Sequence, residues 1–227
     1  MKATIASKKN IAKDTLEVIF ALSEPLEFKA GQYVNVYIDG LKHHFSIANS
    51  PADPKKLTIA TRIRQTPFKQ TLAKLNIGAE VEVDHVEGYF LLPKDEGKKL
   101  VYIAGGIGIT PFMSHLIYIQ ENNLGFDVAL FYSNKTKEQT AYLDILQKWD
   151  EEYGWFSLIA TMTEDDNWQG ERGRINGTMV QKYVSDYKNA IFYIAGPPAM
   201  VASMRDSLKK ELSLPNDNIL TENFTGY

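Results

Sequence analysis

The sequence predicts an all-β domain followed by an α/β domain. The first part of the chain has short β-rich runs broken by turn residues, whereas the second alternates continuous apolar runs with helical segments. The charged turn PKDEGKK separates the two patterns. With 227 residues, 44% of them hydrophobic, the chain can bury two cores. We expect domains at 1–96 and 97–227, with the boundary near Asp95–Lys98.

The β-rich runs of the first domain are TLEVIFAL, QYVNVYI, HFSIA, LTIATRI and EVEVDHV. Glycines and prolines separate them at intervals that are typical of a small antiparallel β-barrel. One segment departs from this pattern, because apolar residues at Phe68, Leu72 and Leu75 have helical spacing. We predict one short helix over residues 68–75.

The apolar runs of the second domain are LVYIA, DVALFY, FSLIAT and AIFYIA. Such runs fit strands buried on both faces, and three of the intervals between them hold helical segments. The pattern predicts a parallel sheet flanked by helices.

Composition excludes several classes of protein. The net charge of -3, with basic residues spread along the chain, gives no basic stripe for a nucleic acid. No apolar run approaches the roughly 20 residues that span a bilayer, and the N-terminal residues lack the apolar segment of a signal peptide. We therefore expect a cytoplasmic protein without a membrane span or a nucleic acid partner.

Residue types also limit the chemistry. The chain has no cysteine, which excludes disulfides, thiol nucleophiles and iron–sulfur clusters held by its own thiolates. The four histidines have no spacing that suits zinc, so we expect no metal site. No serine lies in a G-x-S-x-G elbow, the usual signature of an α/β hydrolase.

A glycine-rich segment, AGGIGITPF, follows the first apolar strand of the second domain. Thr110 suits a helix N-cap and Pro111 a first helical position, which would leave backbone amides exposed to an anion. Gly106 and Gly108 would let a pyrophosphate approach the backbone. The same glycines could simply pack the helix on the sheet, and the motif alone does not decide between these alternatives.

The next strand ends in Ser133, Asn134 and Lys135 rather than in an acidic residue that would hold a ribose diol. Hydroxyl, amide and ammonium groups suit a 2′-phosphate, which favours NADP(H) over NAD(H). The alternative is that Lys135 is a solvated loop lysine.

Another glycine loop, AGPPAM, follows the last apolar run. Gly196 and Pro197 precede a predicted helix over residues 199–212. Ligands of parallel sheets bind at the carboxyl ends of the strands, so we expect this loop and the first one to converge on one dinucleotide.

The motifs HHFSIANSP, TPFKQTL, EGYFLLP, AGGIGITPF, FYSNK, AGPPAM and ENFTGY occur in an order that resembles the ferredoxin–NADP reductase-like superfamily. The resemblance covers nearly the whole chain. It implies an antiparallel flavin-binding β-barrel followed by a Rossmann-like domain that binds NAD(P).

The resemblance also implies cofactor-binding positions. Phe45 would lie against the isoalloxazine ring and Ser46 near its N5 atom. The flavin positions are His43, Phe45, Ser46, Ile47, Thr61, Arg62, Phe68, Lys69 and Gln70. The dinucleotide positions are Gly106, Gly108, Thr110, Ser133, Asn134, Lys135, Gly196, Pro197 and Met200.

His43 departs from the family pattern, which has an arginine that pairs with the flavin pyrophosphate. Histidine lacks the permanent charge and the bidentate fork of arginine. Lys69 or Arg62 could restore the missing charge. The substitution leaves the tightness of flavin binding open, and we expect FAD, with FMN the less favoured alternative.

The C-terminal motif implies that Glu222 and Phe224 lie near the flavin and that Tyr227 covers the ring face used by nicotinamide. Ser46, Glu222 and Tyr227 are the predicted catalytic residues. A frayed chain end is the alternative for this tail.

The implied activity is hydride transfer from NAD(P)H to the flavin, followed by electron transfer to a separate acceptor protein such as ferredoxin or flavodoxin. Two alternatives stay open. One is a flavin reductase whose flavin is a departing substrate, and the other is a nucleotide-binding regulatory subunit without turnover.

Overall fold

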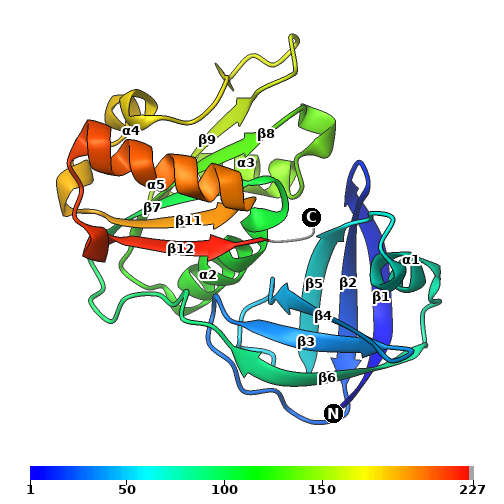
Figure 1. Cartoon of the computed structure of the whole chain (residues 1–227). Helices are drawn as coiled ribbons and strands as arrows, with labels where there is room; N and C mark the ends of the chain where they lie inside the picture. The colour runs from blue at the N-terminus through cyan, green and yellow to red at the C-terminus, as the bar shows by residue number, and fades with distance from the viewer. Residues whose placement is uncertain (225–227) are drawn as a thin grey trace. The chain divides into compact units, whose positions relative to one another are not determined.

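The computed structural model describes residues 1–224, in which the strands form two separate sheets (Figure 1). Internal contacts divide the chain into two compact units. We call the first the barrel unit, which comprises Met1–Leu92 and Thr110–Asn123. The second, the α/β unit, comprises Pro93–Ile109 and, among the described residues, 124–224.

The barrel unit contains an antiparallel sheet in the strand order β4-β3-β6-β1-β2-β5. Its strands are β1 Lys2–Ala12, β2 Thr15–Leu22, β3 Tyr33–Ile38, β4 Leu41–Ser46, β5 Lys56–Arg62 and β6 Glu80–Glu87. Just beyond β4, the Ala48 amide donates to the Thr58 carbonyl of β5 over 2.8 Å, which joins the two end strands. Apolar side chains from all six of these strands form one buried core.

Helix α1, Pro67–Lys74, begins and ends one residue before the predicted segment. Phe68 and Leu72 bury its apolar face. Lys8 of β1 donates from Nζ to the carbonyls of Leu72, Ala73 and Leu75 over 3.1, 2.8 and 2.6 Å. A cation at the carboxyl end of a helix satisfies carbonyls that have no partner within the helix.

The α/β unit contains a parallel sheet in the order β10-β9-β8-β7-β11-β12. The strands are β7 Lys99–Gly105, β8 Asp127–Asn134, β9 Phe156–Met162, β10 Glu171–Arg172, β11 Ile191–Gly196 and β12 Ile219–Asn223. Its helices are α3 Leu143–Glu152, α4 Gly177–Tyr183 and α5 Pro198–Leu212. The predicted fold class, an antiparallel barrel followed by a Rossmann-like parallel sheet, is confirmed.

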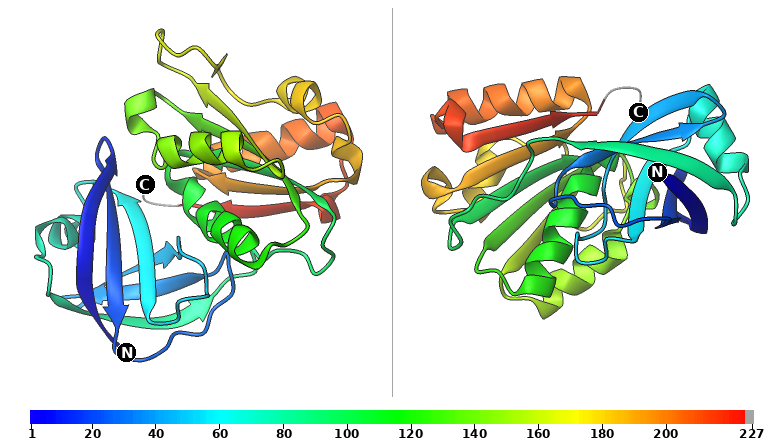
Figure 2. Two further views of the ribbon diagram at one scale, coloured as in Figure 1. Left: turned by 180° about the vertical axis from the view of Figure 1, so that it is seen from behind. Right: turned by 90° about the horizontal axis from the view of Figure 1, so that it is seen from below.

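Helices α4 and α5 cover one face of the parallel sheet, and α3 lies on the other (Figures 1 and 2). Val101, Ile103 and Phe131 point from alternate strand positions toward α4 and α5, where they meet Val180 and Leu208. The strands read as continuous apolar runs because both faces are covered.

Helix α2, Thr110–Asn122, follows β7 in the sequence but groups with the barrel unit. All of its residues from Thr110 to Leu116 are buried. The barrel unit is therefore discontinuous in sequence. The predicted boundary near Asp95–Lys98 stays a prediction.

Candidate functional site

Strand β4 carries the first flavin-binding candidates. In the antiparallel register, His43 lies opposite Val36 and Phe45 opposite Val34, so both side chains share the core-facing side of the sheet. The His43 and Phe45 rings stack with centroids 4.6 Å apart and an interplanar angle of 16°. Phe68 of α1 lies 5.5 Å from His43 and 5.6 Å from Phe45.

This packing covers the Phe45 ring, which is 1% exposed. A flavin that stacked on the ring face occupied by His43 would have to displace His43. Ser46 follows on the opposite side of β4, and Ser46 and Ile47 are both buried. The structure therefore does not turn Phe45 and Ser46 toward one common surface of the strand.

His43 is a neutral ring near pH 7. Its Nδ1 atom donates to the His44 carbonyl over 2.8 Å, which leaves Nε2 as an acceptor. Burial is the main reason that the pKa of His43 is lowered, and the neighbouring Lys69 charge lowers the pKa further. The His44 carbonyl opposes these effects but does not outweigh them. His43 thus lacks the charge that an arginine would bring to a phosphate.

Lys69 lies in the first turn of α1 and is fully buried. Burial, reinforced by the charge of Arg64, lowers the pKa of Lys69 to about 8. Gln70 of α1 holds the segment that precedes the helix, because its Nε2 atom donates to the Arg64 carbonyl over 2.9 Å. Thr61 is buried and donates to the Arg62 carbonyl over 3.3 Å. Lys69 and Gln70 thus lie together in the first turns of α1, whereas Thr61 lies near the end of β5.

The glycine loop after β7 forms a 3-10 turn, Gly106–Ile109, that runs directly into α2. The prediction that Thr110 is an N-cap is wrong, because Thr110 is itself helical and 1% exposed. The helical turns begin at Gly106, before Thr110, because Gly106 adopts a φ of +56° and so turns the chain sharply after β7. The amides that could meet an anion are those of the 3-10 turn.

The glycine loops after β7 and β11 meet, as predicted. Strands β7 and β11 are neighbours, with Ala104 opposite Ala195. A Cβ atom at Gly108 would overlap the Ala195 carbonyl, and one at Gly196 would lie 3.2 Å from Gly105 Cα and 3.0 Å from Met200 Sδ. Gly108 therefore serves the close packing of the 3-10 turn on β11, the simpler of the two alternatives for this glycine. Pro197 precedes α5 and is exposed.

Ser133, Asn134 and Lys135 stand at the end of β8, but they are not separated from acidic groups. Lys135 Nζ lies 2.9 Å from Glu164 Oε1, and the Glu164 amide donates to the Lys135 carbonyl over 2.8 Å. Asp165 accepts from the Lys137 amide over 3.0 Å. The expectation that no carboxylate stands here is wrong, because pairing of the loops after β8 and β9 brings in residues distant in sequence.

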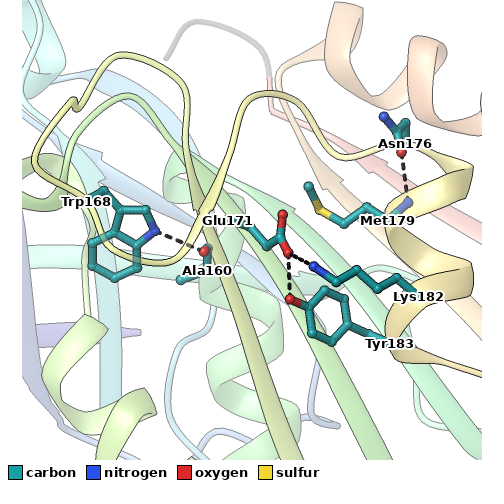
Figure 3. A network of polar contacts seen from close by, with 7 residues as sticks. All are labelled: Ala160, Trp168, Glu171, Asn176, Met179, Lys182 and Tyr183. Carbon is teal, nitrogen blue, oxygen red and sulfur yellow. Dashed lines mark hydrogen bonds and ion pairs between the residues drawn. The ribbon is translucent and has the colours of Figure 1, made fainter.

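The loop that carries Glu164 is fixed at its other end by the contacts in Figure 3. Trp168 Nε1 donates to the Ala160 carbonyl over 3.3 Å. Glu171 Oε1 accepts from Lys182 Nζ and, over 2.6 Å, from the Tyr183 hydroxyl. The Lys182 hydrogen bond is the largest cause of the lowered pKa of Glu171. These contacts tie the loop to β9 and α4.

Strand β12 extends the parallel sheet beside β11, with Glu222 opposite Ala195. The Phe224 amide donates to the Gly196 carbonyl over 2.9 Å, and the Phe224 side chain is 5% exposed. The chain is therefore packed as far as Phe224 and is not frayed there. Tyr227 lies outside the described residues, and its predicted role as a cover for the flavin stays a prediction.

Two buried polar residues of α2 were missed by the sequence reasoning. Ser114 Oγ donates to the Asn49 carbonyl over 2.7 Å, and His115 Nε2 lies 2.8 Å from the Phe90 carbonyl oxygen. Burial lowers the pKa of His115 to about 4. A Ser-His pair inside the apolar run of a helix is the signal that could have indicated these anchors.

The part of the chain that the structure describes contains no cluster of three or more metal-ligating side chains. Among residues 1–224, no helix is both long enough and apolar enough to cross a bilayer.

Residues 102–206 match the family model described as Oxidoreductase NAD-binding domain. The reductase component of propane 2-monooxygenase from Gordonia sp. (strain TY-5) is 29% identical over 97% of this chain and 66% of its own length. One of the subunits of the Na(+)-translocating NADH-quinone reductase from Idiomarina loihiensis is 28% identical over 80% of this chain and 48% of its own length. The chain therefore spans about half to two thirds of the length of these relatives.

Among solved structures, a ferredoxin NADP+ reductase from Neisseria gonorrhoeae with bound FAD and NADP superposes with a TM-score of 0.81. The match covers 98% of each chain at 22% sequence identity, so it is a similarity of fold. The order of the motifs, the two sheets and these similarities all indicate the same fold. The chain has the fold of the ferredoxin–NADP reductase-like proteins, and its residues 102–206 match an oxidoreductase NAD-binding domain.

Proposed function

We propose that this chain oxidises NAD(P)H by way of bound FAD and transfers the electrons to a separate acceptor protein. The observation that carries the proposal is the meeting of the loops at Gly108 and Gly196 at the carboxyl ends of adjacent strands. This is the position at which α/β sheets bind dinucleotides. The bound FAD of the Neisseria structure, in a chain of the same extent, supports the flavin.

The flavin would supply the redox chemistry, by accepting a hydride from the nicotinamide and releasing electrons singly or in pairs. The chain's own residues would bind and orient the flavin and the dinucleotide. The 3-10 turn Gly106–Ile109 would present backbone amides to the dinucleotide pyrophosphate. Lys69 would supply the cation for the flavin phosphate, and Ser46 would hydrogen-bond to the flavin N5 atom.

The acceptor lies outside these 227 residues in this proposal, because they contain no cysteine to hold an iron–sulfur cluster. The relatives described as reductase components support a protein acceptor. The nicotinamide preference is left to experiment, because Glu164 beside Lys135 opposes the charge argument for NADPH.

The test is to load the purified protein with FAD and titrate it anaerobically with NADPH and with NADH. Bleaching of the flavin absorption by either donor, and reduction of ferricyanide under turnover, are the expected results. An exposed-surface variant, Lys9→Ala, is the matched control and should behave as the parent. Flavin-loaded protein that neither bleaches nor reduces ferricyanide would overturn the proposal in favour of a regulatory subunit.

A flavin reductase is the second candidate. The neutral His43 and the covered Phe45 ring favour it, since both weaken the case for a permanently held flavin. Gel filtration of the FAD-loaded protein distinguishes the two. Flavin that elutes with the protein supports a fixed cofactor, whereas loss of flavin together with NAD(P)H-dependent reduction of added flavin supports a departing substrate.

A further inference from the structure

Met200 lies where the loops after β7 and β11 meet in the α/β unit. It is the third residue of α5, and helical side chains tilt toward the N-terminus of their helix, so its thioether points back to the end of β11. A Cβ atom at Gly105 would overlap Met200 Sδ, and a Cβ atom at Gly196 would lie 3.0 Å from the same sulfur. The sulfur therefore takes the space that side chains at these two positions would need.

Exposure separates Met200 from most other methionines of the chain. Of the six methionines, Met1 is 38% exposed and Met200 is partly exposed, in the first turn of α5 after the exposed Pro197. The others are buried, with exposed fractions of 3% for Met113, 1% for Met162, 8% for Met179 and 4% for Met204. A soluble oxidant reaches an exposed thioether before a buried one. Within the α/β unit, Met200 is therefore the methionine that solvent reaches first.

We propose that Met200 is an oxidation site whose sulfoxide weakens dinucleotide binding at these loops. The inference rests on the proposed function, in which the loops bind NAD(P)H. The oxidant is hydrogen peroxide. The sulfur lone pair attacks one peroxide oxygen, and the S–O bond forms as the O–O bond breaks. The proton of the transferred oxygen moves to the departing hydroxide, which leaves as water, so sulfur is oxidised by the two electrons that the peroxide gains.

The sulfoxide changes the packing of the two loops. It converts an apolar sulfur into a larger group with a hydrogen-bond acceptor, and because Gly105 and Gly196 have no side chains to withdraw, backbone must move to make room. Either the loops separate, or the oxygen projects into the space between them. Both outcomes weaken dinucleotide binding, by roughly tenfold or more where a buried acceptor is left unpaired. Methionine sulfoxide can be reduced again, so the change is reversible.

The experiment treats the purified full chain with graded hydrogen peroxide and removes the excess with catalase. Peptide mass spectrometry then gives the oxidised fraction of each methionine, and calorimetry gives the Kd for NADP+. Met200 should be oxidised ahead of the four buried methionines, and the affinity for NADP+ should fall in proportion to the Met200 sulfoxide. The affinity for FAD, whose candidate residues on β4 and α1 lie in the barrel unit, should not change. Treatment with methionine sulfoxide reductases A and B should restore NADP+ binding.

Met200→Leu is the decisive variant, because leucine has a similar volume and no sulfur. Peroxide should leave its NADP+ affinity unchanged, whatever that affinity is before treatment. Met204→Leu, one turn further along α5, is the matched control and should lose affinity as the parent does. Both variants keep Met1, so an effect of Met1 oxidation would appear in both.

Two results with the parent protein would overturn the inference without any variant. One is oxidation of Met200 no faster than that of Met204, and the other is an unchanged NADP+ affinity when Met200 is fully oxidised. Untreated protein that binds neither NADP+ nor NADH would instead refute the proposed function, and with it this consequence of oxidation.

Discussion

His115 is a buried histidine whose titration affects the stability of the folded protein. Its Nε2 atom lies 2.8 Å from the Phe90 carbonyl oxygen, and the Ala30 backbone also forms a hydrogen bond with the ring. The protonated ring could donate to both backbone groups, whereas the neutral imidazole has one N–H and donates to only one of them, so these contacts favour the protonated form. Burial nevertheless outweighs both carbonyls and lowers the pKa of His115 to about 4.

We therefore predict that stability falls as the pH is lowered from about 6.5 to about 4. In this range the unfolded chain binds a proton at His115 and the folded protein does not. The two pKa values imply a loss of about 3 kcal/mol at the acid limit. Urea unfolding at pH 7.5, 6 and 5 should give a shallower pH dependence for His115→Phe than for the parent. The exposed His44→Phe serves as the control, and equal slopes for His115→Phe and the parent would refute the assignment.

The ion pair of Lys135 and Glu164 leads to a prediction about nicotinamide selectivity. Removing the carboxylate with Glu164→Gln leaves the Lys135 charge available to a 2′-phosphate. The kcat/KM ratio of NADPH to NADH should rise by about two- to fivefold, the size typical of one exposed charge. Lys135→Ala should lower the ratio, and both effects should shrink in high salt. Glu151→Gln, on the exposed side of α3, is the control. An unchanged ratio in both variants would show that this strand end does not meet the 2′-position.

At the scale of elements, the contact between the 3-10 turn and β11 depends on Gly108. A Cβ atom there would overlap the Ala195 carbonyl and lie 2.7 Å from the Gly196 amide nitrogen, so backbone must move. We predict that Gly108→Ala destabilises the protein by roughly 1–3 kcal/mol and weakens NAD(P)H binding more than FAD binding. Thermal unfolding and titration with each ligand check this. Gly125→Ala, where a Cβ atom meets nothing within 4 Å, should be near neutral.

The long elements could be predicted from the sequence because their signals are local. The runs LVYIA, DVALFY and AIFYIA became β7, β8 and β11, and the Phe68, Leu72 and Leu75 spacing became α1. The two-residue strand β10 carries no such signal, because its pairing with β9 is set by the fold. The N-cap prediction for Thr110 failed because a Thr-Pro pair is compatible both with a helix cap and with a helical turn that continues from an earlier one.

The candidate site was predictable where a motif lies on one strand end, as at Gly196. It was not predictable where two distant segments meet. Glu164 comes to Lys135 through pairing of the β8 and β9 loops, and His43 is stacked on Phe45 because the barrel turns both toward its core. These contacts depend on how the whole chain folds, so no local sequence motif predicts them.

At the scale of the whole molecule, the barrel unit includes helix α2, which follows the first strand of the parallel sheet in the sequence. Through Ser114 and His115, α2 makes buried hydrogen bonds to Asn49 and Phe90. We predict that a fragment of residues 1–96 is less stable than the barrel of the whole chain. Urea unfolding should give it a lower midpoint, and joining residues 110–123 through a flexible linker should raise that midpoint. A fragment as stable as the parent would show that α2 is dispensable to the barrel.

The contact of Lys8 with α1 also constrains the order in which the chain can fold. Lys8 and the carbonyls it binds are separated by 64 to 67 residues, so this contact closes a long loop. An eight-residue helix is only marginally stable in isolation. The carbonyls at its carboxyl end gain their Lys8 hydrogen bonds only when β1 lies beside the helix. We therefore expect α1 to consolidate late, after β1 has paired within the barrel sheet.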